Sequence, residues 1–470
     1  MSKADKIFDG ITEVRDDLLE QAELHVFKTG RRRYRFTVVA VACLLIAAIL
    51  TTALPEQPGG LIAPAAYAAV QPEYPQMTQY PKDPNSPQYD RWRKDVQAQR
   101  RDNDFSGELE DYFRAAIPQF LSGGEGENAL CSPINVYMAL AMLAETTDGQ
   151  SRQQILDLLG SDSIESLRQQ AGDLWNANYR DDGIVKRLLG SSVWLSEDLA
   201  YKQETLDTLA SNYYAASYAG EMGSADMNEA LRDWIDAHTG GLLSDQTGGL
   251  TLSEDTVMAL ATTVWFKASW QSQFGAEPGV FHTPEGDVEQ EMLKRTSNGT
   301  YYWGDKFSAV GKSFETGTMY FLLPDEGVTP EELLQDEQAL SFLLDRTTLE
   351  DNCKSLKIHM TVPAFDIEDQ MALVDDLRAL GVTDVFDVRT ADFSPLTDEA
   401  AFVSAVTHGT RLKIDEEGCE AVAYTMIAAP GAAPPGAEVE EIDFTVDRPF
   451  LFVLTGANDL PLFVGIVNQP

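Results

Sequence analysis

Residues 413–435 read KIDEEGCEAVAYTMIAAPGAAPP, and this stretch decides the fold that we expect for the chain. Its second half is rich in alanine, glycine and proline, which is typical of a mobile, exposed connection. In its first half, small side chains alternate with larger ones. A strand whose small side chains share one face can enter between two existing strands with that face toward a packed interior. The small residues are Cys419, Ala421, Ala423 and Thr425, and the larger ones are Glu420, Val422 and Tyr424.

Several short motifs surround this stretch in both directions. Each motif alone is modest, whereas their order and spacing form one pattern over residues 105–470. They are NALCSP at 128–133, TTVWFKASW at 262–270, ADFS at 391–394 followed by His408, RPFLF at 448–452, PLFVG at 461–465 and the C-terminal NQP at 468–470.

Together these motifs resemble the serpins, a family of serine protease inhibitors. The segment IDEEGCEAVAYT at 414–425 is similar to the hinge of the serpin reactive loop. The resemblance implies an α+β fold, in which a multi-helix domain surrounds three β-sheets and exposes a reactive-centre loop. In its overall layout, the chain resembles a membrane-anchored bacterial-type serpin.

The resemblance also implies a mechanism and site residues. A serpin is a suicide substrate: a serine protease cleaves the loop and forms a covalent acyl complex, and the freed loop inserts as a new strand of the main sheet. The family spacing places the reactive bond at Ala432–Ala433. Small residues there suit elastase-like or subtilisin-like proteases. The stretch from Gly418 to residues 448–450 is about six residues longer than in many serpins, which can move the bond, for instance to Ala437.

The hinge and the sites called breach and shutter follow from the same resemblance. Trp270 is the expected breach tryptophan, and the expected shutter residues are Ser132, Asn135, Thr262 and His408. The expected hinge consists of Glu416, Glu417, Gly418, Cys419, Glu420, Ala421, Val422, Ala423, Tyr424 and Thr425.

Some positions depart from the family pattern. Thr262 stands where the strand motif usually has asparagine, Ala268 where it has glycine, and Asn135 where the shutter has serine. We hypothesise that Asn135 supplies to His408 the amide that the missing strand asparagine would have given. Cys419 replaces a hydroxyl residue, and we expect it to be buried at little cost because it is small and weakly polar.

Composition limits the other functions. The net charge of −40 argues against nucleic-acid binding, which needs lysine and arginine against phosphate. No HExxH, GxSxG or GxGxxG motif and no Cys/His ligand spacing is present, so we expect no enzyme, cofactor or metal. We expect a monomer whose partner is the target protease. A non-inhibitory surface binding protein of the same fold is the alternative, followed by an unrelated exported enzyme.

Hydrophobic periodicity predicts several elements of the domain. We expect helices at residues 111–121, 134–143 and 230–237. We expect strands at 258–265, 318–323, 356–364, 444–446, 450–454 and 462–467.

Residues 37–54 form an uncharged apolar run long enough to span a bilayer. Five basic residues precede it within 28–35, so the positive-inside rule predicts a cytoplasmic tail at 1–36 and an extracellular C-terminal part. The alternatives are a signal peptide cleaved after residues 66–68, which leaves a secreted protein, a lipoprotein anchor at Cys43 and a buried helix.

Residues 55–104 are rich in proline and lack hydrophobic periodicity. Proline favours extended chain, so this range is predicted to be an extracytoplasmic linker between the membrane helix and a serpin domain at 105–470. The alternative is an ordered strap that packs on the domain.

Overall fold

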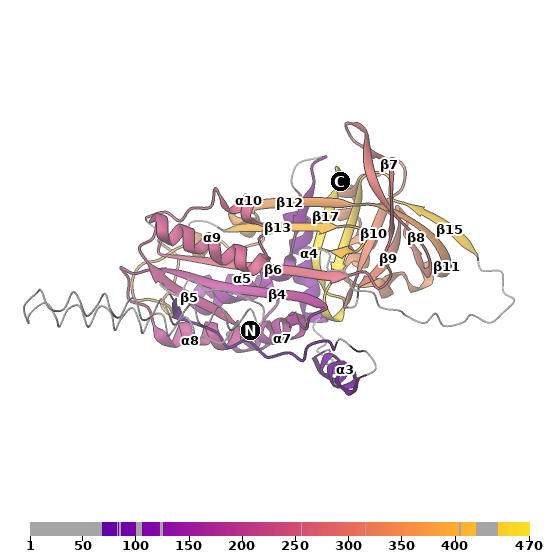
Figure 1. Cartoon of the computed structure of the whole chain (residues 1–470). Coiled ribbons are helices and arrows are strands. Elements are labelled where there is room, and N and C mark those ends of the chain that lie inside the picture. Colours follow the sequence, from indigo (N-terminus) through magenta and orange to yellow (C-terminus); the bar gives the residue numbers. More distant parts are fainter. Residues whose placement is uncertain are drawn as a thin grey trace, which may run out of the picture. The chain divides into compact units, whose positions relative to one another are not determined.

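From residue 68 onward the chain forms β-sheets flanked by helices, as the computed structural model shows (Figure 1). The structure describes residues 68–81, 83, 86–99, 106–122, 126–254, 256–314, 316–403, 406–419 and 440–470. The helices are α3 (Pro87–Gln99), α4 (Ser106–Phe120), α5 (Pro133–Thr146), α6 (Gly149–Leu159), α7 (Ile164–Asn178), α8 (Gln203–Asn212), α9 (Ala225–Thr239), α10 (Ser244–Thr247), α11 (Pro330–Leu334), α12 (Glu337–Leu344) and α13 (Val374–Ala379), with 3₁₀ turns η1 (Arg346–Asn352), η2 (Asp384–Phe386) and η3 (Ala457–Asp459).

The first sheet carries the site described below. Its strand order is β1-β5-β4-β6-β14-β13-β12, and β3 pairs with β4. The strand β14 is very short and lies between two long strands that come from distant parts of the sequence. The strands are β1 (Ala68–Val70), β3 (Arg180–Asp181), β4 (Val185–Ser196), β5 (Ala215–Gly220), β6 (Met258–Ser269), β12 (Phe365–Ala372), β13 (Thr407–Ile414) and β14 (Gly418–Cys419).

The second sheet has the order β15-β11-β8-β9-β10-β16-β17-β2, with β7 paired to β8. The long strand β8 pairs with β7, β11 and β9, and so joins them in one sheet. The described residues therefore form two hydrogen-bonded sheets rather than three. The strands are β2 (Ala129–Cys131), β7 (Gly275–Thr283), β8 (Gly286–Trp303), β9 (Phe307–Phe314), β10 (Gly317–Pro324), β11 (Cys353–Pro363), β15 (Glu441–Thr445), β16 (Phe450–Thr455) and β17 (Pro461–Val467).

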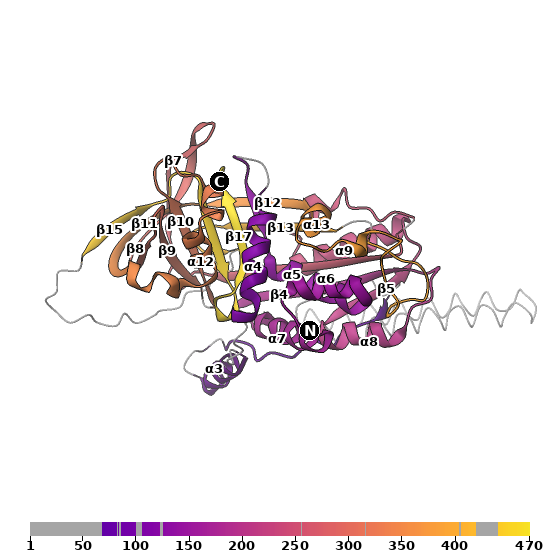
Figure 2. The same ribbon diagram turned by 180° about the vertical axis from the view of Figure 1, so that it is seen from behind.

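Helices cover both faces of the first sheet. α5 is apolar on all sides and buried along nearly its whole length, as expected for a helix that passes through a core. It lies behind β6, and Figure 2 shows it with α6, α7 and α8 on that face. α9 is amphipathic and packs on the opposite face, over β6 and β4 (Figure 1).

The elements predicted from periodicity are present. The three predicted helices fall within or overlap α4, α5 and α9, and the predicted strands coincide with β6, β10, β11, β15, β16 and β17. β11 alternates buried and half-exposed residues, as predicted for a strand with one exposed face. The periodicity was informative because each of these elements buries one face or lies entirely inside the core.

Residues 68–81 and 86–99, here called the strap, pack on the domain. β1 extends the first sheet by pairing with the edge strand β5. The ring of Tyr74 stacks on Trp175, Tyr179 and Tyr214, with centroids 5.8, 5.7 and 6.3 Å away. The described part of the predicted linker therefore behaves as the ordered strap that was the alternative, because its aromatic side chains find apolar surface to cover.

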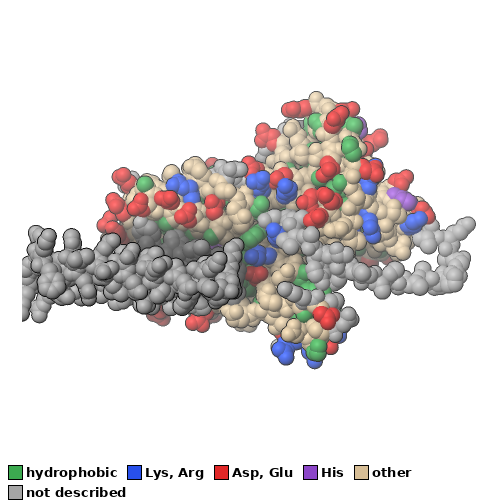
Figure 3. All heavy atoms as spheres, viewed as in Figure 1, with side chains coloured by type: hydrophobic (Ala, Val, Ile, Leu, Met, Phe, Trp, Pro, Cys, Tyr) green, Lys and Arg blue, Asp and Glu red, His purple; other side chains and the backbone are tan. Residues whose placement is uncertain are grey.

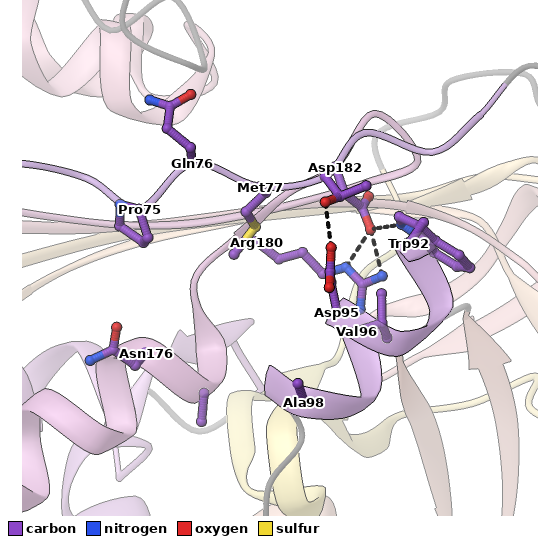
Figure 4. A pocket seen from close by; sticks show the side chains of 12 residues that line it. Pro75, Gln76, Met77, Trp92, Asp95, Val96, Ala98, Asn176, Arg180 and Asp182 are labelled. Atoms are coloured by element: carbon purple, nitrogen blue, oxygen red, sulfur yellow. Dashed lines mark hydrogen bonds and ion pairs between the residues drawn. The ribbon is translucent and has the colours of Figure 1, made fainter. Parts of the chain in front are cut away.

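The helix of the strap is attached by a buried polar cluster (Figure 4). The indole Nε1 of Trp92 donates to Asp182 Oδ2 at 2.9 Å, and Arg180 Nε donates to the same oxygen at 2.6 Å. A cavity of about 390 Å³ lies between the strap, the end of α7 and this cluster. A domain that began at residue 105 would lack these contacts.

No helix within the described ranges is long and apolar enough to cross a membrane. Residues 37–54, where the membrane helix is predicted, lie outside those ranges, as does the predicted tail at 1–36.

Candidate functional site

The site begins with a tight turn that follows β13. Asp415 Oδ1 accepts hydrogen bonds from the backbone N–H groups of Glu417 and Gly418, at 2.9 and 3.0 Å. The backbone N–H of Asp415 donates to the carbonyl of Gly418 at 3.0 Å. An aspartate that bonds its own backbone two and three residues later is a common turn device, so Asp-Glu-Glu-Gly reverses the chain at this point.

The chain then enters the first sheet as β14. Gly418 lies opposite Ser269 and Cys419 opposite Ala268, both antiparallel to β6, while Cys419 also lies opposite Ile414 of β13. A side-chain carbon on Gly418 would collide with the carbonyl oxygen of Ala268, so this approach requires glycine. Cys419 is 1% exposed, in agreement with the expectation that it is buried.

Trp270 binds the turn through two hydrogen bonds. Its backbone N–H donates to the carbonyl of Glu417 at 3.0 Å, and its indole Nε1 donates to the carbonyl of Asp415 at 2.8 Å. The ring stacks on Phe314, with centroids 4.0 Å apart. One buried tryptophan therefore joins β6, the hinge turn and the second sheet.

Below Cys419 the two long strands are not joined. In the described part of the sheet, β6 and β13 are neighbours only through β14. Three cavities occupy the space between them, of about 220, 50 and 10 Å³. The first two are lined by Met258 and Leu260 of β6 and by Thr407 of β13, and the third by Val264 and Gly409. We call this space the slot.

The slot has two chemically different faces. Phe266, Val264 and Leu260 of β6 contact the main core, on the side of α5. Ala259 and Ala261 contact the smaller cluster around Trp194 and Trp234, on the side of α9. A strand that entered the slot would therefore place alternate side chains against the main core and beneath α9.

On the core side, His408 of β13 lies against the start of α5. Its Nε2 accepts a hydrogen bond from the backbone N–H of Ser132 at 3.1 Å, so this nitrogen is unprotonated. Burial lowers the pKa of His408 to about 4, because a charged imidazole would lose its hydration there. The hydroxyl of Ser132 is buried with no partner among the described residues.

Asn135 has a different partner from the one that we hypothesised. Its Nδ2 donates to the carbonyl of Thr262 at 3.2 Å, while His408 accepts from Ser132 instead. Carbonyls four residues apart on a strand point to the same edge. The thiol of Cys419 lies 3.8 Å from the carbonyl of Phe266, so the Thr262 carbonyl also faces the slot. The Asn135 amide thus satisfies a carbonyl that no strand among the described residues pairs with.

The family model for Serpin (serine protease inhibitor) matches residues 113–470. The chain belongs to the serpin family. Serpins are named for inhibiting proteases, so membership also supports the prediction that this chain is not an enzyme.

Individual serpins resemble the chain over most of its length. Alpha-1-antiproteinase of Rattus norvegicus is 27% identical over 78% of this chain and 89% of its own length. The native state of Tengpin, a thermophilic serpin, is 25% identical with a TM-score of 0.69, over 78% of this chain and 95% of that chain. Thyroxine-binding globulin in complex with thyroxine shares the fold at 18% identity and a TM-score of 0.67, over 77% of this chain and 99% of that chain.

Of the hinge, the structure describes Glu416, Glu417, Gly418 and Cys419. The remaining hinge residues and the predicted reactive bond lie outside the described residues; they are Glu420, Ala421, Val422, Ala423, Tyr424, Thr425, Ala432 and Ala433.

Two residues of this serpin site were missed by sequence reasoning. Asp415 stands inside the quoted hinge motif, and the Asp-Glu-Glu-Gly pattern could have identified it as the residue that forms the turn. Phe314, which stacks on Trp270, comes from another sheet, and no local pattern indicates that contact.

Proposed function

We propose that this serpin is a suicide-substrate inhibitor of serine proteases and acts by loop cleavage and insertion. One observation carries the proposal: the hinge lies in the first sheet at Gly418 and Cys419, and beyond them β6 and β13 are not paired with each other in the described part of the sheet. A cleaved loop that continues in this direction gains main-chain hydrogen bonds to both β6 and β13.

The register of β14 predicts where the loop ends up. If the pairing of Cys419 with Ala268 continues, Thr425 comes opposite Thr262 and Ala429 comes opposite Met258, the first residue of β6. Pro430 is the first residue beyond the strand, and no proline precedes it in the inserted stretch. Every inserted residue therefore has the backbone N–H that a central strand requires.

The side chains of the loop also match the two faces of the slot. Residues directly opposite one another on antiparallel strands share a face. Ala421 and Ala423 would lie opposite Phe266 and Val264, on the crowded core side. Tyr424 would lie on the α9 side, opposite Gly409 of β13, where the absent side chain leaves room.

The chemistry follows from the serpin resemblance. The protease serine attacks the carbonyl carbon of Ala432, the amide bond to Ala433 breaks, and the amine of Ala433 leaves with a proton. The acyl bond then carries the protease along as the loop inserts. Inhibition requires that insertion outrun hydrolysis of this bond, which small residues on the core face favour.

The test mixes residues 61–470 with pancreatic elastase and with subtilisin and resolves the products on a denaturing gel. We expect a complex that survives boiling and, by mass spectrometry, a released C-terminal fragment that starts at Ala433. A fragment that starts elsewhere within 430–439 would assign the reactive bond to another position but would still support the mechanism. Clean loop cleavage without a complex would refute inhibition and favour a non-inhibitory binding role, which thyroxine-binding globulin shows to be compatible with this fold.

We further propose that residues 37–54 anchor the serpin with its C-terminal domain outside the cell. The uncharged run and the basic residues before it support this orientation. We expect the full chain to remain in membranes washed with alkaline carbonate and to keep its original N-terminus. Release into the medium with a new N-terminus after residue 68 would instead indicate a cleaved signal peptide.

A further inference from the structure

The five residues that follow β6, residues 270–274, lie between the hinge turn and the second sheet, and we call them the clamp. Two of them bond to the hinge turn through the main chain. The backbone N–H of Trp270 donates to the carbonyl of Glu417, and that of Phe274 donates to the carbonyl of Glu416, both at 3.0 Å. The clamp therefore holds the turn at both of its ends.

Strand β9 holds the clamp from the other side. Lys312 and Phe314 stand two residues apart on this strand, so their side chains share a face. The Phe314 ring stacks on Trp270, and these two residues also form an isolated antiparallel bridge. Between them, the carbonyl of Ser313 accepts a hydrogen bond from the backbone N–H of Gln271 at 3.0 Å. The clamp and β9 are thus joined beside Lys312.

The side chain of Lys312 makes two further contacts with the clamp. Its Nζ donates to Ser272 Oγ at 2.7 Å and lies 4.7 Å from the centroid of the Phe274 ring. A cation at that distance is attracted by the face of an aromatic ring. The Phe274 ring in turn meets Trp270 edge-on, with centroids 5.5 Å apart. The ammonium therefore contacts a residue whose own backbone bonds to the hinge turn.

This ammonium is buried away from carboxylates. Lys312 is 6% exposed, and no ion pair of its side chain occurs among the residues that the structure describes. Burial lowers the pKa of Lys312 to about 8, and the charge of Arg295 acts in the same direction. Acidic side chains are plentiful on this protein of net charge −40, as its visible face in Figure 3 shows. A buried cation without one of them costs stability, so stability alone does not explain a lysine at this position.

We propose that Lys312 is a positioning residue for the hinge. Through Ser272 and Phe274 it fixes the clamp, and the clamp holds the turn at 415–418 in the place from which β14 enters the sheet. The effect on the turn stands by itself, whereas a role of Lys312 in loop insertion rests on the proposed inhibitory function.

Hydrogen exchange of the full chain, followed by mass spectrometry, tests the effect on the turn. Lys312→Met removes the charge and keeps a long unbranched side chain. Exchange should become roughly three- to tenfold faster in peptides covering 269–275 and 414–419, as expected when a cation loses its contact with an aromatic ring. Lys294→Met is the matched control, because this exposed lysine of β8 pairs with Glu277 and not with the clamp. Faster exchange confined to 269–275, or unchanged exchange in both peptides, would overturn the proposal.

Urea unfolding separates positioning from general support of the fold. Because Lys312→Met removes a buried charge that has no carboxylate, its urea midpoint should equal or exceed that of the natural chain. A lower midpoint with faster exchange in every core peptide would assign Lys312 to the whole fold and overturn the proposal. Ser272→Ala removes only the acceptor of the Lys312 bond and serves if Lys312→Met does not fold. It should speed exchange in 414–419 roughly twofold, and no change there would equally overturn the proposal.

A pH profile gives a readout that an uncharged contact would not move. In the fold, Lys312 loses its proton as the pH rises through about 8, whereas Arg295 keeps its charge. Protection of 414–419, relative to an unfolded peptide at the same pH, should therefore fall between pH 7 and about 9.5 in the natural chain. In Lys312→Met it should stay constant. The carboxylates of the turn are common to both chains, so parallel profiles would refute a role of the ammonium.

Protease inhibition distinguishes this proposal from the inhibitory function. Lys312→Met should raise the number of inhibitor molecules consumed per protease roughly twofold or more, because insertion starts from a less firmly held turn, and Lys294→Met should not. An unchanged number would overturn a role in insertion. If no chain forms a complex while the exchange results hold, the inhibitory function fails and the positioning of the turn stands. If Lys312→Met exchanges and inhibits like the natural chain, the positioning fails and the inhibitory function stands.

Discussion

The indole Nε1 of Trp270 donates a 2.8 Å hydrogen bond to the carbonyl of Asp415, 145 residues later in the chain. The bond ties the end of β6 to the turn from which the loop departs, and the same ring stacks on Phe314 of the second sheet. Any movement of the hinge must therefore disturb the contacts of Trp270, a buried residue that packs against both sheets.

Trp270→Phe should keep an aromatic ring against Phe314, but it removes this hydrogen bond and the second ring of a buried indole. The free energy of unfolding of residues 61–470 should fall by about 2 kcal/mol or more, from the lost bond and the cavity together. Urea unfolding followed by fluorescence measures the change. Trp303→Phe is the matched control, because Trp303 is 38% exposed, and its substitution should alter stability by less than about 0.5 kcal/mol.

Gly418→Ala should expel β14 from the sheet. The added carbon would collide with the carbonyl of Ala268, and that backbone cannot move without disturbing β6. Hydrogen exchange followed by mass spectrometry should show faster exchange in a peptide covering 414–419. Gly248→Ala, where nothing lies within 4 Å, should leave the same peptide unchanged. Equal protection in both variants would mean that the hinge does not depend on this close approach.

Ala423→Glu should convert the inhibitor into a substrate. By register this residue enters opposite Val264 on the core side, where an unpaired carboxylate costs several kcal/mol, so insertion should slow by more than about tenfold. The gel should then show cleaved serpin and active protease. Val422→Glu carries the same charge to the α9 side, toward Arg411, and should retain inhibition. Loss of inhibition in both variants would contradict the assignment of faces.

Acid should destabilise the fold in part through His408. Its pKa is lowered from 6.5 in the unfolded chain to about 4 in the fold, so the unfolded state binds the extra proton between these values. Stability is therefore present above pH 6.5 and is lost as the pH falls toward 4, by about 2 kcal/mol between pH 7 and 4.5. His408→Gln should remove that part of the pH dependence in urea titrations at the two pH values.

Two other histidines check the sign of this effect. Burial also lowers the pKa of His238 to about 4, so His238→Gln should reduce the acid sensitivity in the same direction. The exposed His282 bonds to Asp287, which raises its pKa. Its contribution is present at low pH and lost as the pH rises, so His282→Gln should not reduce the acid sensitivity.

Removal of the strap should weaken the domain. A chain of residues 105–470 lacks Tyr74 and Trp92 and exposes the rings and the Arg180–Asp182 pair that they cover. We expect it to be less stable than 61–470 by about 3 kcal/mol or more, the usual cost of deleting a packed aromatic side chain. Tyr74→Ala should reproduce much of the loss, whereas the exposed Gln76→Ala should not. Equal stability of the two chains would mean that the strap is an independent linker.

Much of this serpin could be predicted from local patterns. The alternation from Cys419 to Thr425 predicts a strand with one small face, because a strand exposes its side chains with a period of two. The apolar run within α5 predicts a helix buried on all sides. The family resemblance predicts Trp270 as the breach tryptophan and Ser132 and His408 as shutter residues.

Other features are decided by contacts between distant residues. The proline-rich composition of 55–104 predicts an extended linker. In the structure Tyr74 stacks on Trp175 and Trp92 donates a hydrogen bond to Asp182, so both residues pack on the domain. Asn135 bonds to Thr262 rather than to His408, because no strand of the described sheet pairs with the Thr262 carbonyl on the side of the slot. Periodicity indicates which face of a segment is buried, but it does not identify the residues that cover that face.

By itself, the sequence determined the family, the helices and strands of the core, and the residue types that a loop needs in order to enter a sheet. These properties depend on side-chain size and spacing along a single segment. Only the tertiary structure decided that the hinge already occupies two positions between β6 and β13. It also decided that Cys419 lies opposite both Ala268 and Ile414, because strand order and register arise from pairing across the whole chain.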